Sequence, residues 1–219
     1  GLNYKYGGWH LTRTLAFGAG PSSGRLFVTV GSSCNACEEK EEIRATLSVM
    51  DADGKNARIL GRNLRNAGGL RTVGADLYGT NMGADHLGDN APEDTMFRLV
   101  EGPAGESRYY GWPYCYFQGG RVHDDPKFTG LPGKTACSQV PRPFATFAAH
   151  SSPLGLEYFD AGTPAAALKD VFLVALHGSS HKRLKRGYKV VRIAAGRQQD
   201  FVSGFLQNGV IYGRPCDIL

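Results

Sequence analysis

The sequence predicts an all-β protein of the propeller class, on three observations. Glycine makes up 30 of the 219 residues, helical periodicity is scarce, and short apolar runs recur with turns between them. Repeated sets of about four short strands, at intervals of roughly 40–50 residues, are typical of propeller blades. With 42% hydrophobic residues, the chain can bury a core. A β-sandwich is the alternative fold.

The expected strands follow one another along the chain and end at turn residues. Asp53-Gly54 is a strong turn signal. A polar, Pro/Gly-rich insertion at about 117–142 interrupts the pattern, and residues 164–169 predict a single helical turn. The strands are expected at 13–17, 25–31, 45–50, 77–80, 96–100, 154–159, 170–176 and 187–193.

The charge pattern excludes some classes of partner. The 25 Lys and Arg against 20 Asp and Glu give a net charge of +5, with one short basic cluster at 181–186. Nucleic-acid binding needs basic residues spread over a face with stacking aromatics, so we expect an anionic small ligand instead. No apolar run approaches the roughly 18 residues that span a bilayer. No signal peptide is visible, but Gly1 to Tyr4 do not look like a native start, so export stays open.

The five cysteines predict two disulfides. Cys34 and Cys37 form a C-x-x-C, but neither a second C-x-x-C nor a well-spaced His pair completes a zinc site. We expect Cys34–Cys37 and Cys115–Cys137 bridges in an oxidising compartment, which leaves Cys216 single. Reduced thiols in a cytoplasmic protein are the alternative.

Two polar features are candidates for chemistry. Arg65-Asn66 lies in a Gly-flanked turn, where a guanidinium fork and a carboxamide can grip a flat polyanion. His10 comes just before the first expected strand, where the inner strand of a blade meets the central channel, and could remove a proton near neutral pH. Taken singly, the pair also fits a solvated loop, and His10 fits a structural or surface histidine.

Further segments, in order through nearly the whole chain, add to these. They are His10-x-x-Arg13-x-Leu15-x-Phe17, Val30-Gly31-Ser32-Ser33-Cys34-Asn35-x-Cys37-Glu38-Glu39, Leu64-Arg65-Asn66-x-x-Gly69-Leu70, Asn81-x-Gly83-x-Asp85-x-Leu87-Gly88-Asp89-x-x-Pro92, Tyr110-Gly111-Trp112-Pro113-Tyr114-Cys115, His177-Gly178-Ser179 with Gly187-Tyr188-Lys189-Val190, and Gly213-Arg214-Pro215-x-Asp217. As a set they resemble the soluble quinoprotein sugar dehydrogenases, in particular the aldose and sorbosone dehydrogenase branch.

The resemblance implies a six-bladed β-propeller that binds pyrroloquinoline quinone (PQQ) and Ca²⁺ in its channel. Residues 1–219 would be part of one such domain and supply about four blades. The implied reaction oxidises an aldose or sorbosone-like sugar aldehyde to a lactone or acid, and an external electron acceptor completes turnover. The implied location is periplasmic or secreted, and a homodimer is left open.

The resemblance also implies roles for the first part of the site. His10 corresponds to the general base that takes the proton from the sugar's anomeric hydroxyl while hydride passes to quinone carbon C5. Arg65 and Asn66 correspond to cofactor contacts, and the guanidinium also polarises a quinone oxygen. Gly83 and Ala84 correspond to two backbone carbonyls that bind the cofactor-bound Ca²⁺, a hard cation suited to oxygen ligands.

For the last part of the site the resemblance implies basic residues that meet the cofactor carboxylates. Arg214 matches one; Arg183 and Lys185 compete for another, and His177 is a further cofactor-facing candidate. Cys216 stands where some relatives carry a second arginine. Ala84 stands where some members have Pro, a change that leaves the backbone carbonyl in place.

Two other functions remain as alternatives. A non-catalytic propeller would use its channel or rim to bind glycans or proteins, because function depends on the site rather than on the fold. A propeller hydrolase or lactonase would need converging Glu, Asp and Asn side-chain metal ligands, and the sequence shows no such convergence around Gly83.

Overall fold

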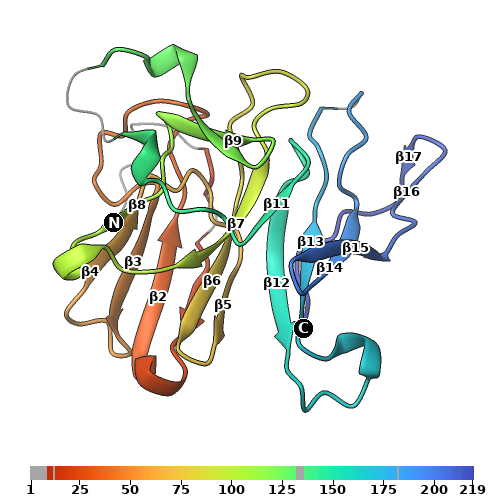
Figure 1. Cartoon of the computed structure of the whole chain (residues 1–219), viewed down its shortest axis with the longest axis horizontal. Helices are drawn as coiled ribbons and strands as arrows, with labels where there is room; N and C mark the ends of the chain where they lie inside the picture. Colours follow the sequence, from red (N-terminus) through yellow and green to blue (C-terminus); the bar gives the residue numbers. More distant parts are fainter. Residues whose placement is uncertain (1–8, 12, 132–135, 182) are drawn as a thin grey trace.

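The computed structural model describes residues 9–11, 13–131, 136–181 and 183–219. These residues form an all-β architecture whose longer strands lie in three sheets, side by side in chain order from red to blue (Figure 1). The described residues contain no α-helix, only short 3₁₀ helices. These are η2 (Gly20–Ser22), η3 (Pro103–Gly105), η4 (Pro126–Phe128), η5 (Cys137–Gln139) and η6 (Ala166–Leu168).

The first sheet has the strand order β1-β2-β3-β4-β8. Its first four strands form an antiparallel meander, and β8 adds to β4 in parallel. The strands are β1 (Leu15–Phe17), β2 (Arg25–Val30), β3 (Thr46–Asp51), β4 (Arg58–Arg62) and β8 (Arg108–Tyr109).

The second and third sheets are antiparallel and have four strands each, in the orders β11-β7-β6-β5 and β12-β13-β14-β15. The second contains β5 (Leu70–Val73), β6 (Asp76–Asn81), β7 (Asp94–Leu99) and β11 (Ala145–Phe147). The third contains β12 (Pro153–Phe159), β13 (Val171–Leu176), β14 (Lys189–Ala194) and β15 (Arg197–Val202). Two hairpins, β9 (Cys115–Gln118) with β10 (Arg121–Asp124) and β16 (Leu206–Gln207) with β17 (Val210–Ile211), complete the strands.

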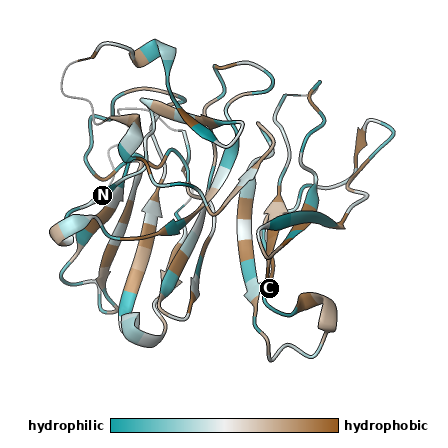
Figure 2. Cartoon of the chain, viewed as in Figure 1, coloured by the Kyte–Doolittle hydropathy of each residue, from teal (hydrophilic) through white to brown (hydrophobic). Residues whose placement is uncertain are grey.

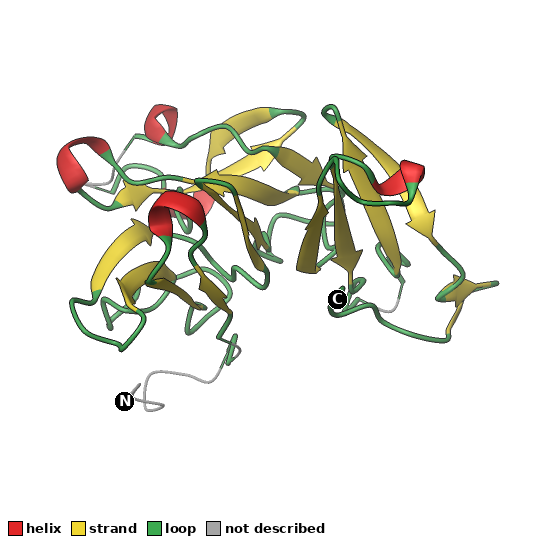
Figure 3. Ribbon diagram, turned by 90° about the horizontal axis from the view of Figure 1, so that it is seen from below, coloured by secondary structure: helices red, strands yellow, loops and turns green. Residues whose placement is uncertain are grey.

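Apolar side chains pack face to face between neighbouring sheets, as in adjacent propeller blades. One core cluster joins Leu47 of the first sheet to Phe97 of the second, and another joins Met96 of the second to Val174 of the third. The innermost strands β1, β5 and β12 contact one another in turn. Seen from below, the sheets form an arc (Figure 3).

The outermost strand of the third sheet is polar. All six residues of β15 are exposed, and in Figure 2 this strand is largely teal beside the browner β13. A solvated outer strand and buried inner strands fit a blade whose inner edge faces the middle of the molecule.

The all-β class and the strand pattern are confirmed. Each expected strand overlaps an observed one, and η6 occupies the expected helical turn. About four blades were expected, and the described residues form three such sheets followed by the β16–β17 hairpin. The six-blade count stays a prediction. Among the described residues, no helix is long and apolar enough to cross a membrane.

Both expected disulfides are confirmed. Cys34 pairs with Cys37, and Cys115 pairs with Cys137. Cys216 is a free, exposed thiol, as expected. The first bridge closes a loop directly after β2, and the second joins β9 to η5.

Candidate active site

His10 and Arg65 line one pocket of about 490 Å³. Residues far apart in the sequence meet there, because β2, β4 and β6 all end at this side of the molecule. The lining residues are Trp9, His10, Arg65, Met82, Gly83, Asp85, Asp94, His150, Ser152 and Ser180.

The hydrogen bonds around Ser32 define the tautomer of His10. Ser32 Oγ donates its single proton to the Cys34 carbonyl oxygen at 2.7 Å. It therefore accepts from His10 Nδ1–H, which lies 2.8 Å away. The lone pair of the imidazole is then on Nε2, the nitrogen that a general base in the pocket would use. Arg13 Nη1 donates to the His10 carbonyl oxygen at 3.0 Å and fixes the backbone.

Burial keeps the His10 imidazole neutral. Loss of solvation, and second the positive charge of Arg65, lower the pKa of His10 from 6.5 to about 4. At neutral pH the ring is consequently unprotonated and able to accept a proton.

His10 and Asn66 approach each other across Gly31. A Cβ on Gly31 would lie 2.5 Å from the His10 Cβ and 2.8 Å from Asn66 Oδ1. No side chain fits there, so a glycine at the end of β2 is needed to bring these residues together.

Arg65 is buried, and its guanidinium is held from two sides. Nε donates to the Asn35 carbonyl oxygen at 2.9 Å, and Nη2 donates to Asn35 Oδ1 at 2.8 Å. Nη2 also lies 2.9 Å from Asp85 Oδ2 in an ion pair. Burial lowers the pKa of Arg65, and Asp85 opposes that shift. Among the described residues, Nη1 has no hydrogen-bond partner, which leaves it for a ligand.

Asn66 is held mainly through its backbone. Its N–H donates to Asn81 Oδ1 at 3.1 Å, and its carbonyl oxygen accepts from Met82 N at 3.1 Å. The side-chain Nδ2 lies 3.3 Å from Met82 Sδ, a weak acceptor. The carboxamide is thus lightly bonded next to the pocket.

Gly83 and Ala84 follow the end of β6, and a buried carboxylate holds the Gly83 amide. Asp94 Oδ1 accepts from Gly83 N at 2.7 Å, and Oδ2 accepts from Ser152 N at 2.8 Å. Burial raises the pKa of Asp94 to about 6. Within the described part of the chain, neither the Gly83 nor the Ala84 carbonyl oxygen accepts a hydrogen bond. Both are therefore compatible with cation binding.

His150 also lines the His10 pocket. Nε2 lies 2.8 Å from the Gly88 carbonyl oxygen, and Nδ1 lies 3.1 Å from Asp85 Oδ1. Three non-glycine lining residues have positive φ angles: His10 at 47°, His150 at 65° and Ser152 at 54°. Such backbone strain gathers at functional sites.

Three side chains that could bind a metal come together in the structure, although the sequence showed no convergence of metal ligands around Gly83. Asp85, His150 and His181 can each direct one ligand atom so that the three lie within 4.8 Å of one another. Asp85 is already paired with Arg65, and His150 with Gly88. These contacts make Asp85 and His150 part of the hydrogen-bonded network that holds Arg65.

The predicted residues thus fall into two groups. We call His10, Arg65, Asn66, Gly83 and Ala84 the early wall. The late wall comprises His177, Arg183, Lys185 and Arg214.

Arg214 lies directly behind the pocket lining. Nη1 donates to the Gly178 carbonyl oxygen at 3.0 Å, and Nη2 donates to the Ser179 carbonyl oxygen at 3.2 Å. The guanidinium carbon lies 5.0 Å from the centre of the Tyr188 ring, a cation–π contact. The residue after Ser179, Ser180, lines the His10 pocket.

None of the four late-wall residues lines this pocket. Arg183 is exposed, and its Nη2 pairs with Asp89 Oδ1 at 2.5 Å. Lys185 is exposed as well. His177 Nδ1 lies 3.2 Å from the Pro215 carbonyl oxygen, and burial lowers the pKa of this ring.

The profile of the TrAA12-like family matches residues 2–205. The chain belongs to the TrAA12-like family.

Other proteins similar to this TrAA12-like chain are about twice as long. An uncharacterized protein of Borreliella burgdorferi (strain ATCC 35210 / DSM 4680 / CIP 102532 / B31) is 25% identical over 209 residues, which cover 89% of this chain and 52% of the relative. An iodide structure of Trichoderma reesei Carbohydrate-Active Enzymes Family AA12 has a TM-score of 0.70 and 19% identity, and the match covers 90% and 57% of the two chains.

A third match is the holo form of the pyranose dehydrogenase PQQ domain from Coprinopsis cinerea, with a TM-score of 0.64 and 20% identity over 90% and 56% of the two chains. These structures support the propeller-like fold. The chain spans about half the length of the proteins it matches.

Sequence reasoning gave no role to several residues of the TrAA12-like site. Ser32, Asn35 and Asp85 lie inside the segments that carry the family resemblance. The sequence therefore placed them near the predicted site residues but did not reveal their contacts. Asp94 begins an ordinary strand, and His150 follows two alanines. No local pattern marks either residue, because each makes its contacts with loop residues that are distant in the sequence.

Proposed function

We propose that this chain forms the catalytic face of a PQQ- and Ca²⁺-dependent dehydrogenase that oxidises an aldose or sorbosone-like sugar aldehyde to a lactone or acid. The observation that carries this is a neutral His10 whose Nδ1–H is bonded to Ser32, in one pocket with Arg65 and Gly83. Membership of the TrAA12-like family supports a sugar oxidoreductase.

The residues present fit such a cofactor. PQQ is a flat polyanion, and the early wall offers Arg65 Nη1 and the Asn66 carboxamide as donors. The Gly83 and Ala84 carbonyl oxygens suit Ca²⁺, which takes backbone oxygen ligands. Arg214, with Lys185 and Arg183 on the neighbouring loop, would supply the cationic side for carboxylates, and His177 would face the cofactor as a neutral imidazole. When bound, the cofactor supplies two-electron acceptance, which Ca²⁺ promotes by polarisation.

In this reaction the residues of the chain handle the proton and the charge. His10 Nε2 accepts the proton of the sugar hydroxyl, and Ser32 keeps Nδ1 protonated during the transfer. Arg65, fixed by Asn35 and Asp85, presents a positive charge where negative charge develops. Because the guanidinium is already oriented, little reorganisation is needed at that moment.

The wider context is also part of the proposal. Residues 1–219 are part of one propeller domain, since continuous apolar cores join all three sheets. An external acceptor removes the electrons. Two disulfides support an oxidising compartment, periplasmic or secreted.

Reconstitution tests the proposal. Full-length apoprotein is mixed with PQQ and Ca²⁺, desalted, and assayed for dye reduction with a panel of aldoses and sugar aldehydes. We expect retained cofactor absorbance and sugar-dependent reduction that needs both additions. Absence of both would overturn the assignment and favour a binding propeller, whereas metal-dependent lactone hydrolysis without PQQ would favour a hydrolase.

The variant His10→Ala tests the base. We expect turnover to fall by about 10²–10⁴-fold, the usual contribution of a general base, while PQQ absorbance after desalting is kept. Asp76→Ala is the control, because it removes the carboxylate that pairs with exposed Arg98 on the second sheet. Full turnover in His10→Ala would show that the base is another group.

A further inference from the structure

We propose that Asn35, presented by the Cys34–Cys37 disulfide loop, is a positioning residue for Arg65. The proposal rests on the proposed function for the role of Arg65 in turnover, but the geometry itself can be tested in apoprotein. We define the disulfide loop as residues 32–39, directly after β2.

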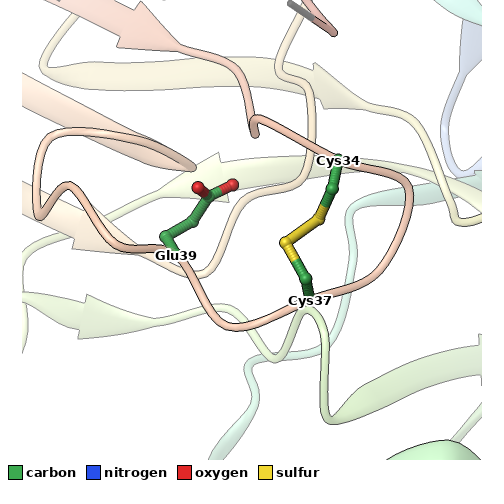
Figure 4. Close-up of side chains that lie close together, drawn as sticks. All are labelled: Cys34, Cys37 and Glu39. Atoms are coloured by element: carbon green, nitrogen blue, oxygen red, sulfur yellow. A yellow bond between two sulfur atoms is a disulfide. The ribbon is translucent and has the colours of Figure 1, made fainter. Parts of the chain in front are cut away.

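The disulfide loop is closed twice. The Cys34–Cys37 bridge spans only three positions, and Glu39 lies beside it (Figure 4). Glu39 accepts from Ser33 N at 2.6 Å and from Ser33 Oγ at 2.7 Å. Lys127 Nζ also donates to the Ala36 carbonyl oxygen at 2.6 Å. The bridge and these bonds leave the backbone at Asn35 few alternatives.

Asn35 uses both of its oxygen atoms twice. Its carbonyl oxygen accepts from Arg65 Nε and, at 3.1 Å, from Trp112 Nε1. Its Oδ1 accepts from Arg65 Nη2 and, at 2.8 Å, from Asp85 N. One residue thereby holds the guanidinium and also the backbone of the aspartate that pairs with it.

The disulfide loop contacts both the backbone and the side chain of Arg65. Ser32 N donates to the Arg65 carbonyl oxygen at 2.8 Å, and Asn35 receives the guanidinium. Because the Arg65 side chain is only 4% exposed, a looser Asn35 would leave the guanidinium N–H groups without these acceptors. Arg65 would then shift toward Asp85 or the pocket, and its position for catalysis would be lost.

The first test compares Asn35→Ala with Asn35→Asp in the full-length protein. Alanine removes Oδ1, whereas aspartate keeps an acceptor there. We expect Asn35→Ala to lower kcat about tenfold, the value of one hydrogen bond to a charged group, with KM for sugar changed less than kcat. Asn35→Asp should recover most of kcat. Asp76→Ala, which removes an acceptor from exposed Arg98, should leave kcat unchanged.

The second test needs no cofactor. In apoprotein, NMR follows hydrogen exchange of the Arg65 Nε–H and the Trp112 indole N–H, each assigned by substitution. We expect slow exchange in the wild type, faster exchange of both signals in Asn35→Ala, and faster exchange in the double variant Cys34→Ser/Cys37→Ser. Thermal unfolding establishes that each variant is folded.

The outcomes separate the two proposals. Slow exchange that the variants accelerate, in a protein that oxidises no sugar, would sustain the positioning role and overturn the proposed function. Unchanged exchange in Asn35→Ala and in the double cysteine variant would overturn the positioning role, even in an active enzyme. Equal kcat in Asn35→Ala and wild type would also overturn it.

Discussion

The early wall and the late wall both contain groups that we propose meet the cofactor, but they are built differently. Arg65 of the early wall is buried and bonded to two residues through its side chain. Arg214 of the late wall donates to two backbone carbonyl oxygens and to the Tyr188 hydroxyl, without a carboxylate partner among these contacts, and Arg183 is exposed in a surface ion pair.

The difference separates chemistry from binding. A buried, multiply bonded charge has one orientation, which suits a step that depends on fixed geometry. An exposed cation on a loop can adjust to a carboxylate and contributes mainly affinity. We therefore expect substitutions of His10 and Arg65 to change kcat or stability most, and substitutions of the late-wall cations to change mainly cofactor affinity.

The largest effect on stability is expected for Arg65→Leu. It removes the buried guanidinium that donates to Asn35 twice and to the exposed carboxylate of Asp85, and a hydrogen bond to a charged group contributes about 1.5–3 kcal/mol. Arg98→Leu, which breaks the exposed pair with Asp76, should cost about 1 kcal/mol or less. Urea unfolding of both variants measures the contrast; equal losses would remove the distinction between buried and exposed arginines.

The pH dependence of turnover tests the electrostatics of the early wall. Since the pKa of His10 is about 4, kcat/KM should fall only as the pH drops toward 4, where the imidazole becomes protonated. Arg65→Gln removes a positive charge that disfavours the imidazolium, so its acid limb should move to higher pH. A wild-type limb at the ordinary histidine value of about 6.5 would contradict the burial of His10.

The smallest effect is expected for Arg183→Ala. Its guanidinium is exposed and paired with Asp89, and exposed pairs contribute about 1 kcal/mol or less. The PQQ dissociation constant, measured by absorbance titration, should rise by about fivefold at most. A much larger rise would show that Arg183 is an essential cofactor contact, contrary to this prediction.

Local patterns were sufficient for most of the fold. Alternating or continuous apolar runs such as 171–176 predicted buried strands, and the C-x-x-C without a second metal-ligand pair predicted a disulfide. The first four residues of β15, Arg197-Gln-Gln-Asp200, carry no apolar signal because both faces of that outer strand are exposed to solvent. Residues 197–202 form a strand because they pair with β14, so their own sequence is not sufficient to predict it.

The candidate site was predictable only in part, for a related reason. His10, Arg65 and Asn66 were predicted because the segments that contain them, taken as a set and in order, resemble a known family. Asn35 and Asp85 act through contacts with Arg65 across 30 and 20 positions, and His150 meets Asp85 across 65 positions. Such contacts depend on how the loops at the strand ends fold over one another, so no spacing within the sequence reveals them.

The central claim is that His10 of the early wall performs the proton transfer, whereas Arg214 of the late wall contributes affinity for the cofactor. The most direct test measures kcat at saturating PQQ and Ca²⁺, together with the PQQ dissociation constant, in His10→Gln and Arg214→Gln. For His10→Gln we predict a loss of kcat of about 10²–10⁴-fold and little change in the dissociation constant. For Arg214→Gln we predict a dissociation constant raised about tenfold and kcat nearly unchanged. The reverse pattern, with cofactor affinity lost in His10→Gln and kcat lost in Arg214→Gln, would contradict the account.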